Sequence, residues 1–338
     1  MLSMNYGMQL SRIALMFSSL GLTFGALATS LVVFLYVYRN FRIRMASIVL
    51  VLVLFLSVLL NPSNSSWNFF ALYTIVLGIL IQSSSYSFVA LKTAKLLFYL
   101  QSWMFVLGIA IFEYEAGLSG GGFKIVNDFT LQYSILGLYI SVISRDFRYQ
   151  CLCLIVSILN SAELLTIANA FIIFVHLKTY MKVLGSVAII VTISVFNEQI
   201  FEMMNLIIYT IENGIAGLAC GSRCFRVFAL YHFGYLFLDF PQAIFGLGLG
   251  FTQDTLEGMK SYDAAIMAGS MHNFVFQLLF ELGVVVFGFL IYVLRVHHLS
   301  LPLLVFITIA LASTSNSVFS LGLVFLIIGQ IIFFKRNH

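Results

Sequence analysis

Residues 272–294 read HNFVFQLLFELGVVVFGFLIYVL, and this run decides how the chain folds. His272 and Asn273 open it, and Gln277 and Glu281 are the strongly polar side chains inside it. A helix that spans a bilayer needs about 20 consecutive, mostly apolar residues. The run therefore predicts a membrane-spanning helix, and its few polar side chains call for a structural or chemical reason.

The composition of the whole chain agrees with a membrane protein. Of the 338 residues, 61% are hydrophobic and 9% are charged, and the mean hydropathy is +1.05. A soluble domain carries about a quarter charged residues. The first apolar run, 10–38, is too long for the hydrophobic part of a cleaved signal peptide, so we expect it to stay as an anchor. The composition predicts an all-α polytopic integral membrane protein.

Further apolar runs give the number of expected spans. They occupy 10–38, 45–60, 69–90, 96–112, 129–144, 147–160, 163–177, 183–196, 272–294, 299–312 and 318–334. The first run contains GLTFG at 21–25, so it is either one tilted span or two short ones. We therefore expect 11 or 12 transmembrane helices.

The basic residues between these runs predict the orientation. Twelve of the 17 Lys and Arg residues lie in alternate connections, and Asp146 is the one acidic residue among them. These twelve are Arg39, Arg42, Arg44, Lys92, Lys95, Arg145, Arg148, Lys178, Lys182, Arg295, Lys335 and Arg336. Positively charged loops stay in the cytoplasm. The other connections are therefore expected to face outward.

The longest connection, 197–271, is predicted to be an ordered external subdomain. Long loops without structure of their own are usually functional or disordered. This one is rich in Phe, Leu, Ile and Tyr, which disfavours disorder. We expect one or two helices that lie on the membrane surface. The chain then divides into an N-terminal helix bundle (1–196), the external loop (197–271) and C-terminal transmembrane helices (272–338).

Two arginines stand out in the external segment. Arg223 and Arg226 are three residues apart, so on a helix they share a face. A guanidinium group matches the oxygens of a phosphate with two parallel hydrogen bonds. The alternative is that both arginines pair with nearby carboxylates or with lipid headgroups.

Three alternating glycines follow in PQAIFGLGLGF (241–251). Gly246, Gly248 and Gly250 suggest a nucleotide-binding loop, but no strand-to-helix unit and no Lys-Ser/Thr pair follows them. We therefore favour a tight turn or close packing of the backbone. The alternative is that the bare backbone lets a bulky substrate approach.

The polar residues of the opening run divide by position. Histidine has an unperturbed pKa near neutrality, so His272 suits a general base. Asn273, Gln277 and Glu281 are spaced by four and line one helical face. Ionisable groups inside a membrane usually face a bundle interior or a water-filled cavity. Alternatively, these side chains hold helices together by hydrogen bonds.

Two smaller features leave alternatives open. Glu163 follows Asn160 and Ser161, and we expect one of these two to cap a helix whose first turn holds Glu163. The alternative is that all three point into an outward cavity. Cys220 and Cys224 could form a short disulfide, which sequence spacing alone does not settle.

The order of these motifs resembles the O-antigen polymerase and O-antigen ligase superfamily. The matching stretches are GSRCFRVFALYHFGYLFLDFPQAIFGLGLGF (221–251) and MHNFVFQLLFELGVVVFGFL (271–290). The resemblance implies a multi-pass protein of the bacterial inner membrane with a large periplasmic loop. It also implies a glycan donor carried on undecaprenyl pyrophosphate, a lipid-linked acceptor, membrane lipid and a chain-length regulator protein as partners.

The resemblance also implies a role for each matching residue. Arg223 and Arg226 would hold the lipid-linked pyrophosphate and stabilise its charge as it leaves. His272 would take the proton from the attacking sugar hydroxyl. Asn273 would orient His272 or the sugar, and Glu281 would bind or orient substrate. We expect no cofactor and no metal, because the pyrophosphate is already a good leaving group.

One departure favours a polymerase over a ligase. Ligases of this superfamily often carry a Ser-Arg pair in a turn between two earlier short spans, whereas the similar turn here reads LNSAELL (159–165). The interpretations left open are a ligase that transfers glycan to the lipid A core and a flippase for the same lipid-linked sugars. Transporters often show internal repeats, and we find none in this sequence.

Overall fold

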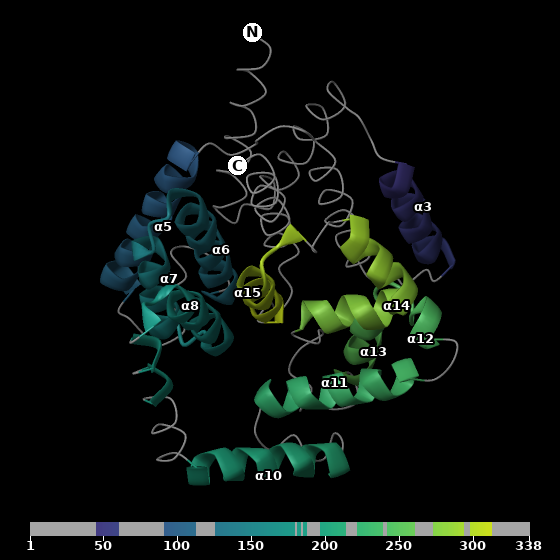
Figure 1. The fold of residues 1–338 in the computed structure, drawn as a ribbon. Helices are drawn as coiled ribbons and strands as arrows, with labels where there is room; N and C mark the ends of the chain where they lie inside the picture. The colour runs from purple at the N-terminus through teal and green to yellow at the C-terminus, as the bar shows by residue number, and fades with distance from the viewer. Residues whose placement is uncertain are drawn as a thin grey trace.

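In the structure, a computed structural model, every regular element among the described residues is a helix. The described residues are 45–60, 91–112, 126–179, 181–183, 185–187, 197–213, 222–238, 242–260, 273–293 and 298–312. The helices in chain order are α3 (Met45–Leu60), α5 (Leu91–Phe112), α6 (Val126–Ser144), α7 (Arg148–Leu159), α8 (Glu163–His176), α10 (Asn197–Asn213), α11 (Ser222–Leu238), α12 (Gln242–Phe245), α13 (Phe251–Lys260), α14 (Phe274–Val293) and α15 (Leu301–Ala312) (Figure 1). The all-α fold class is therefore confirmed for this part of the chain.

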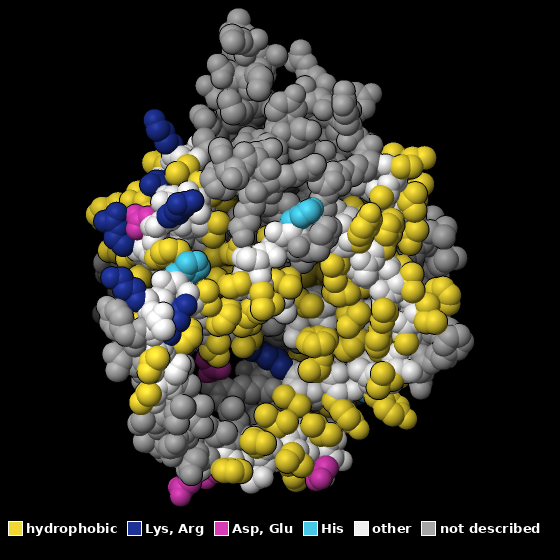
Figure 2. Space-filling model, viewed as in Figure 1, with side chains coloured by type: hydrophobic (Ala, Val, Ile, Leu, Met, Phe, Trp, Pro, Cys, Tyr) yellow, Lys and Arg dark blue, Asp and Glu magenta, His cyan; other side chains and the backbone are white. Residues whose placement is uncertain are grey.

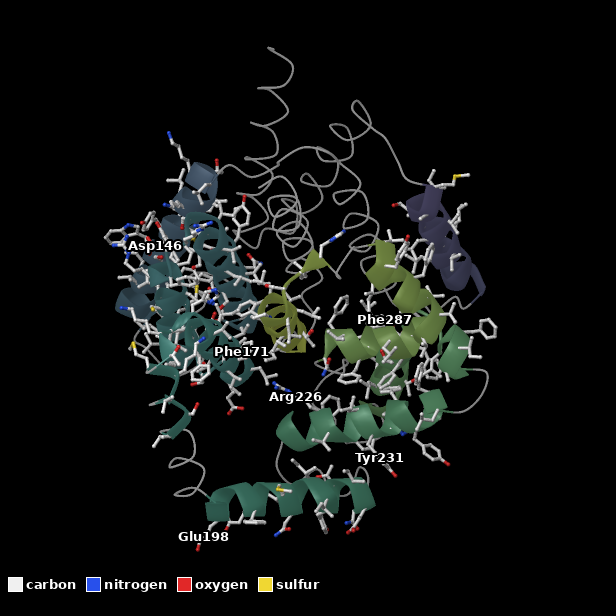
Figure 3. The ribbon with its side chains drawn as sticks, viewed as in Figure 1. Asp146, Phe171, Glu198, Arg226, Tyr231 and Phe287 are labelled. Carbon is white, nitrogen blue, oxygen red and sulfur yellow. The ribbon has the colours of Figure 1, made fainter. Side chains whose placement is uncertain are left out.

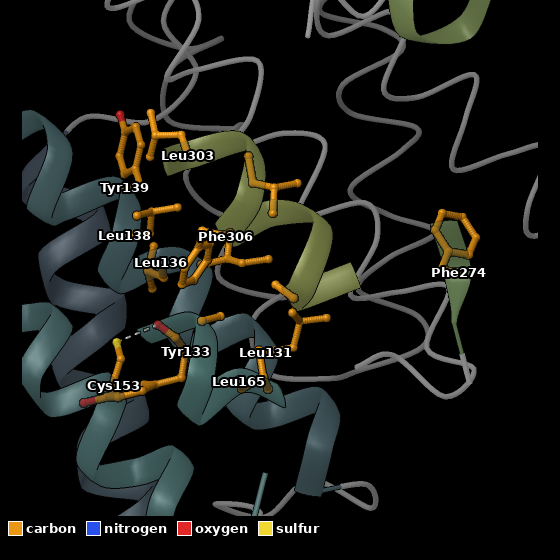
Figure 4. Close-up of a cluster of buried hydrophobic side chains, with 14 of the residues drawn as sticks. Leu131, Tyr133, Leu136, Leu138, Tyr139, Cys153, Leu165, Phe274, Leu303 and Phe306 are labelled. Atoms are coloured by element: carbon orange, nitrogen blue, oxygen red, sulfur yellow. Dashed lines mark hydrogen bonds between the residues drawn. The ribbon is translucent and has the colours of Figure 1, made fainter. Parts of the chain in front are cut away.

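The first group of helices is a bundle of α5, α6, α7 and α8 with α15 packed against it (Figure 1). Its core includes Tyr133 and Leu136 of α6, which are almost completely buried together with Phe306 of α15 (Figure 4). Tyr133 stacks on Phe98 of α5 with ring centroids 4.3 Å apart. A residue of the C-terminal part of the chain thus completes the core of the N-terminal bundle.

Hydrogen bonds between side chains also join these helices. Asn169 of α8 donates to the Ser134 hydroxyl of α6 at 3.0 Å, and its carbonyl accepts a hydrogen bond from Gln150 of α7. Asn160 donates to Thr130 at 2.9 Å. All five side chains are buried. Polar side chains of this kind join helices in apolar surroundings, where a group without a partner costs free energy.

The second group lies under α14 and comes from the segment predicted to be an external subdomain. α10 packs against α11, and α11 packs against α12 and α14. In Figure 1, α10 and α11 run side by side across the end of the molecule. The sequence predicted one or two interfacial helices here, and the described residues of 197–271 contain α10 and α11 as well as the shorter α12 and α13.

One face of α11 is fixed by aromatic packing. Phe225, Ala229, Phe233 and Phe237 recur every four residues and are buried. They form a cluster with Leu256 of α13 and Phe280 of α14. Side chains four apart lie one above the other on a helix. This stripe therefore sets the rotation of α11 about its axis, and with it the direction of Arg226.

The predicted runs and the observed helices agree in most of the bundle. The run 45–60 has the bounds of α3, and the runs 129–144, 147–160 and 163–177 differ from α6, α7 and α8 by a few residues at most. The start of α8 differs from expectation. Its N-cap is Ala162, without a side-chain cap, while Asn160 caps the C-terminus of α7 and donates to Thr130. Glu163 does lie in the first turn of α8.

Helix length bears on the predicted spans. Among the described residues, α14 (Phe274–Val293) is the one helical segment that is long and apolar enough to cross a membrane by length and composition, and its backbone leaves the helical conformation at Gly283. α7 and α15 have 12 residues each, which is about 18 Å of helix against a hydrocarbon core of about 30 Å. The runs 10–38, 69–90 and 318–334 lie outside the described residues.

Candidate functional site

A break in α14 organises the candidate site. Gly283 has φ 73° and ψ 166°, so the helix ends at Leu282 and a second helical piece begins after Gly283. Figure 1 shows the two halves of α14 at a wide angle to each other, with the bend next to α12. Such a break leaves carbonyl groups of the first half without their usual partners.

The glycine loop supplies partners for those carbonyls. The N–H of Leu247 donates to the carbonyl of Phe280 at 2.8 Å, and the N–H of Gly248 donates to that of Glu281 at 3.0 Å. Gly246, Gly248 and Gly250 all have positive φ, at 82°, 98° and 85°. Only glycine takes up such angles without strain. The prediction of a tight turn with close backbone packing is confirmed.

The loop and the break approach each other so closely that neither accepts a side chain. A Cβ on Gly246 would overlap the carbonyl of Glu281, and a Cβ on Gly283 would lie 2.5 Å from the N atom of Gly246. The two sequence motifs that carry the family resemblance, one around Gly246 and one ending at Gly283, therefore form a single structural unit.

Glu281 lies at the centre of this unit and is completely buried. Its Oε1 accepts a hydrogen bond from the hydroxyl of Thr252, at the start of α13, and another from the Gln277 amide at 3.3 Å. Gln277 and Glu281 therefore share a face of α14, as their spacing predicted. The carboxyl group of Glu281 therefore joins α13 to α14.

Asn273 begins the first half of α14. Its Oδ1 accepts the backbone N–H of Phe276 at 3.2 Å, which is the geometry of an N-cap. This bond leaves the amide nitrogen of Asn273 as the group that could reach a substrate. His272, the predicted proton acceptor, is the residue before this cap and lies outside the described residues.

Arg226 projects from the first half of α11 toward a hollow in the molecule. Figure 2 shows this hollow at the centre of the face in view, with a basic side chain inside it and an acidic one at its edge, and Figure 3 identifies the basic one as Arg226. The Nε atom of Arg226 is buried and has no hydrogen-bond partner among the described residues. Arg223 lies one turn earlier on the same helix, and its side chain is not among those described.

An unpartnered guanidinium nitrogen has a chemical consequence. A buried donor without an acceptor costs free energy relative to its hydrated state. An anionic oxygen within hydrogen-bond distance of this nitrogen would remove the cost and gain a charge-assisted hydrogen bond. The arrangement is therefore suited to binding an anion.

His232 is a second histidine near this region, and the sequence interpretation did not single it out. It lies two turns after Phe225 on α11, and its ring packs against Phe228 and Phe233 with centroids 5.7 and 5.3 Å away. Burial lowers the pKa of His232. The neutral imidazole is therefore favoured at pH 7, and the ring packs as an aromatic group.

No related protein is found that would assign a function to this site. Comparison of the chain with protein-family models, with curated proteins and with solved structures finds no match. In the described part of the chain, no group of three or more His, Cys, Asp or Glu residues is placed to hold a metal ion. The site therefore has to be interpreted from its own residues.

The sequence interpretation missed two contacts that complete the site. Thr252 was not singled out, because a threonine after a glycine-rich stretch has no distinctive spacing to a distant glutamate. The pairing of Gly246 with Gly283 was missed for the same reason, although each glycine lies in a motif that was recognised. A contact between residues this far apart in the chain leaves no periodic signal.

Proposed function

We propose that the protein is a membrane glycosyltransferase that polymerises surface polysaccharide, of the O-antigen polymerase type. It would join oligosaccharide repeat units carried on undecaprenyl pyrophosphate at the outer face of the bacterial inner membrane. The donor would lose its glycan to the terminal sugar of an acceptor unit, and undecaprenyl pyrophosphate would be released.

One observation carries this proposal. The glycine motif and the Glu-Leu-Gly end of the His-Asn motif, which are about 35 residues apart in sequence, are joined by two backbone hydrogen bonds. α11, which carries both arginines, packs on the same unit through Phe237 and Phe280, whose ring centroids lie 5.2 Å apart. The three motifs of the resemblance are thus parts of one structural unit, next to a hollow that holds an arginine.

The arginines would bind and stabilise the leaving group. The oxygen of the acceptor hydroxyl attacks the anomeric carbon, and the bond from that carbon to the pyrophosphate oxygen breaks. Negative charge grows on the pyrophosphate as this bond breaks. A guanidinium that is already fixed in place stabilises this charge most strongly in the transition state. The buried Nε of Arg226 is one donor for that purpose.

His272 would accept the proton of the attacking hydroxyl. It directly precedes Asn273, whose own side chain caps α14. Proton transfer of this kind typically contributes 10²–10⁴ in rate.

Products formed in cells separate the polymerase from a ligase and from a flippase. In a lipopolysaccharide-producing host, loss of a polymerase leaves lipid A core capped with a single repeat. Loss of a ligase leaves uncapped core, and loss of a flippase stops export of the repeat. We expect deletion of the gene to give the single-repeat product and wild-type protein to restore long chains.

Point variants then test the site within the same assay. Arg226→Ala should give the single-repeat product, while Arg148→Ala, at an exposed position near the other end of the bundle, should support long chains. Both proteins should be present in the membrane at similar amounts. Uncapped core in the deletion strain, or long chains from Arg226→Ala, would contradict the proposal.

A further inference from the structure

The cytoplasmic ends of the bundle helices, as predicted from sequence, gather basic side chains at one place. We call this set the basic rim, and Figure 2 shows Lys and Arg side chains along the left side of the molecule, from its upper part to its middle. The rim consists of Lys92, Lys95, Arg145, Arg148, Lys178 and Lys182. These residues lie at the starts of α5 and α7 and after the ends of α6 and α8. Four helix termini therefore bring their charges to one end of the bundle.

The rim is poorly neutralised within the protein. Asp146 is the one acidic residue in the connections that carry the rim. The Asp146 carboxylate forms an ion pair with Arg148 at 2.8 Å. That contact is the one ion pair in the part of the chain that the structure describes. Hydrogen bonding from Arg148 lowers the pKa of Asp146, so this carboxylate stays charged and committed to one arginine. The remaining basic groups are left for an external anion.

An apolar surface begins directly beyond the rim along the same helices. On α5, Leu96, Tyr99 and Trp103 are exposed by 59%, 50% and 66%. On α7, Ile155 and Ile158 are exposed by more than half. Both helices start at the rim and run away from it. On each helix the basic residues therefore come first, and the exposed apolar residues follow. Water-exposed surfaces of soluble proteins seldom carry apolar patches of this kind.

Two tyrosines mark the boundary between these surfaces. The Tyr99 and Tyr149 hydroxyls lie 3.0 Å apart, and the Lys95 ammonium lies 5.4 Å from the centre of the Tyr149 ring. Tyrosine and tryptophan are enriched where a membrane meets water, with the ring in the apolar layer and the polar group outside it. In a membrane, the tyrosine pair would therefore lie at the depth of the phospholipid phosphates.

We propose that the basic rim binds the headgroups of anionic phospholipids, with the acyl chains lying along the exposed faces of α5 and α7. A phosphate group would contact Lys95 and Arg145, and the tyrosine hydroxyls would lie beside the ester region. A nucleic acid or an acidic protein would match the charge of the rim but would leave Leu96, Trp103 and Ile155 in water. This site is separate from the hollow that holds Arg226, so it stands whether or not the proposed function is correct.

Native mass spectrometry of the full-length protein tests the proposal. Detergent-purified, delipidated protein is titrated with phosphatidylglycerol and, in parallel, with zwitterionic phosphatidylethanolamine of the same acyl chains. Each basic group near a membrane surface strengthens anionic-lipid binding by about fivefold. The double variant Lys95→Gln/Arg145→Gln should therefore bind phosphatidylglycerol about 25-fold more weakly. Its affinity for phosphatidylethanolamine should not change.

Two control variants keep the test decisive. Lys260→Gln removes the same type of charge from the end of α13, outside the rim, and should bind phosphatidylglycerol as the wild type does. Lys95→Arg keeps the charge at the rim and should also preserve binding. Size-exclusion elution and far-ultraviolet circular dichroism confirm that each variant is folded. Equal affinity of the wild type for both lipids, or undiminished phosphatidylglycerol binding by the folded double variant, would overturn the proposal.

Discussion

Gly246 and Gly283 lie backbone to backbone, and a Cβ placed on Gly283 would come within 2.5 Å of the N atom of Gly246. The contact closes the bend in α14 and brings the N–H groups of Leu247 and Gly248 to the carbonyls that the bend exposes. Two of the carbonyls at the break, those of Phe280 and Glu281, thus have hydrogen-bond partners. In hydrocarbon such partners are needed, because no water is present to replace a missing one.

Alanine at Gly283 should be strongly destabilising. The backbone angles there are accessible essentially to glycine alone, and the added Cβ would overlap the carbonyl of Ile244. The strain costs about 1–3 kcal/mol before the overlap is counted. The apparent melting temperature of purified Gly283→Ala, followed by tryptophan fluorescence, should fall by several degrees or the protein should fail to accumulate.

Gly288 is the matched control on the same helix. A Cβ there would meet no atom within 4 Å, and its backbone is helical. Gly288→Ala should therefore leave stability unchanged or raise it by up to about 1 kcal/mol. Equal melting temperatures for the two variants would show that the loop does not pack against the bend as described.

Thr252→Val should loosen α13 from α14. Valine has nearly the shape of threonine but lacks the hydroxyl that donates to the buried Glu281. Loss of a donor to a buried acceptor costs about 1–3 kcal/mol. Thermal unfolding should show this loss for Thr252→Val, and Thr252→Ser, which keeps the hydroxyl, should recover most of it. A valine variant as stable as the wild type would mean that this hydrogen bond contributes nothing.

Gly137 and Cys153 give a test of bundle packing. A Cβ on Gly137 of α6 would overlap the Sγ of Cys153 on α7, so Gly137→Ala alone should be destabilising. Cys153→Ala removes that sulfur and makes room for the added methyl group. The double variant should therefore be more stable than the sum of the single effects predicts, by roughly 0.5–3 kcal/mol. Strict additivity of the melting shifts would argue against contact at this position.

The proposed activity should need both the charge and the planar shape of the Arg226 guanidinium. Arg226→Gln removes the charge, and the expected loss of polymerase rate is about 10²–10³, as for other preorganised transition-state donors. Lysine keeps the charge but lacks the planar fork, so Arg226→Lys should recover part of the rate only. Chain elongation in membranes from the two strains, compared at equal protein amounts, measures this difference. Full activity of Arg226→Gln would remove Arg226 from the site.

Much of the bundle was predictable because it follows from local pattern. Each apolar run of 45–60, 129–144, 147–160 and 163–177 matches a helix, since hydrophobic length and flanking charge fix both ends within a few residues. The expected helix cap at Asn160 is wrong. The Asn160 side chain bonds to Thr130, 30 residues earlier, so a tertiary contact replaced the expected local cap.

The bend in α14 was not predictable from its own sequence. Residues 272–294 have the composition of one continuous span, and a single glycine within such a run is compatible with a straight helix. The helix breaks because the 246–250 loop is there to receive its carbonyls. The spacing of Asn273, Gln277 and Glu281 did predict a shared face, but which of them would be buried depended on Thr252 and α13.

Purified protein in phospholipid nanodiscs shows whether this protein elongates a lipid-linked glycan, as proposed. The substrate is the undecaprenyl-pyrophosphate-linked repeat unit of the native host, and products are resolved by mass spectrometry. We expect the wild-type protein to form undecaprenyl pyrophosphate together with carriers that bear two or more repeats, and we expect neither product from Arg226→Ala or His272→Ala. Unchanged single repeats with the folded wild-type protein, or normal elongation by both variants, would contradict the proposal.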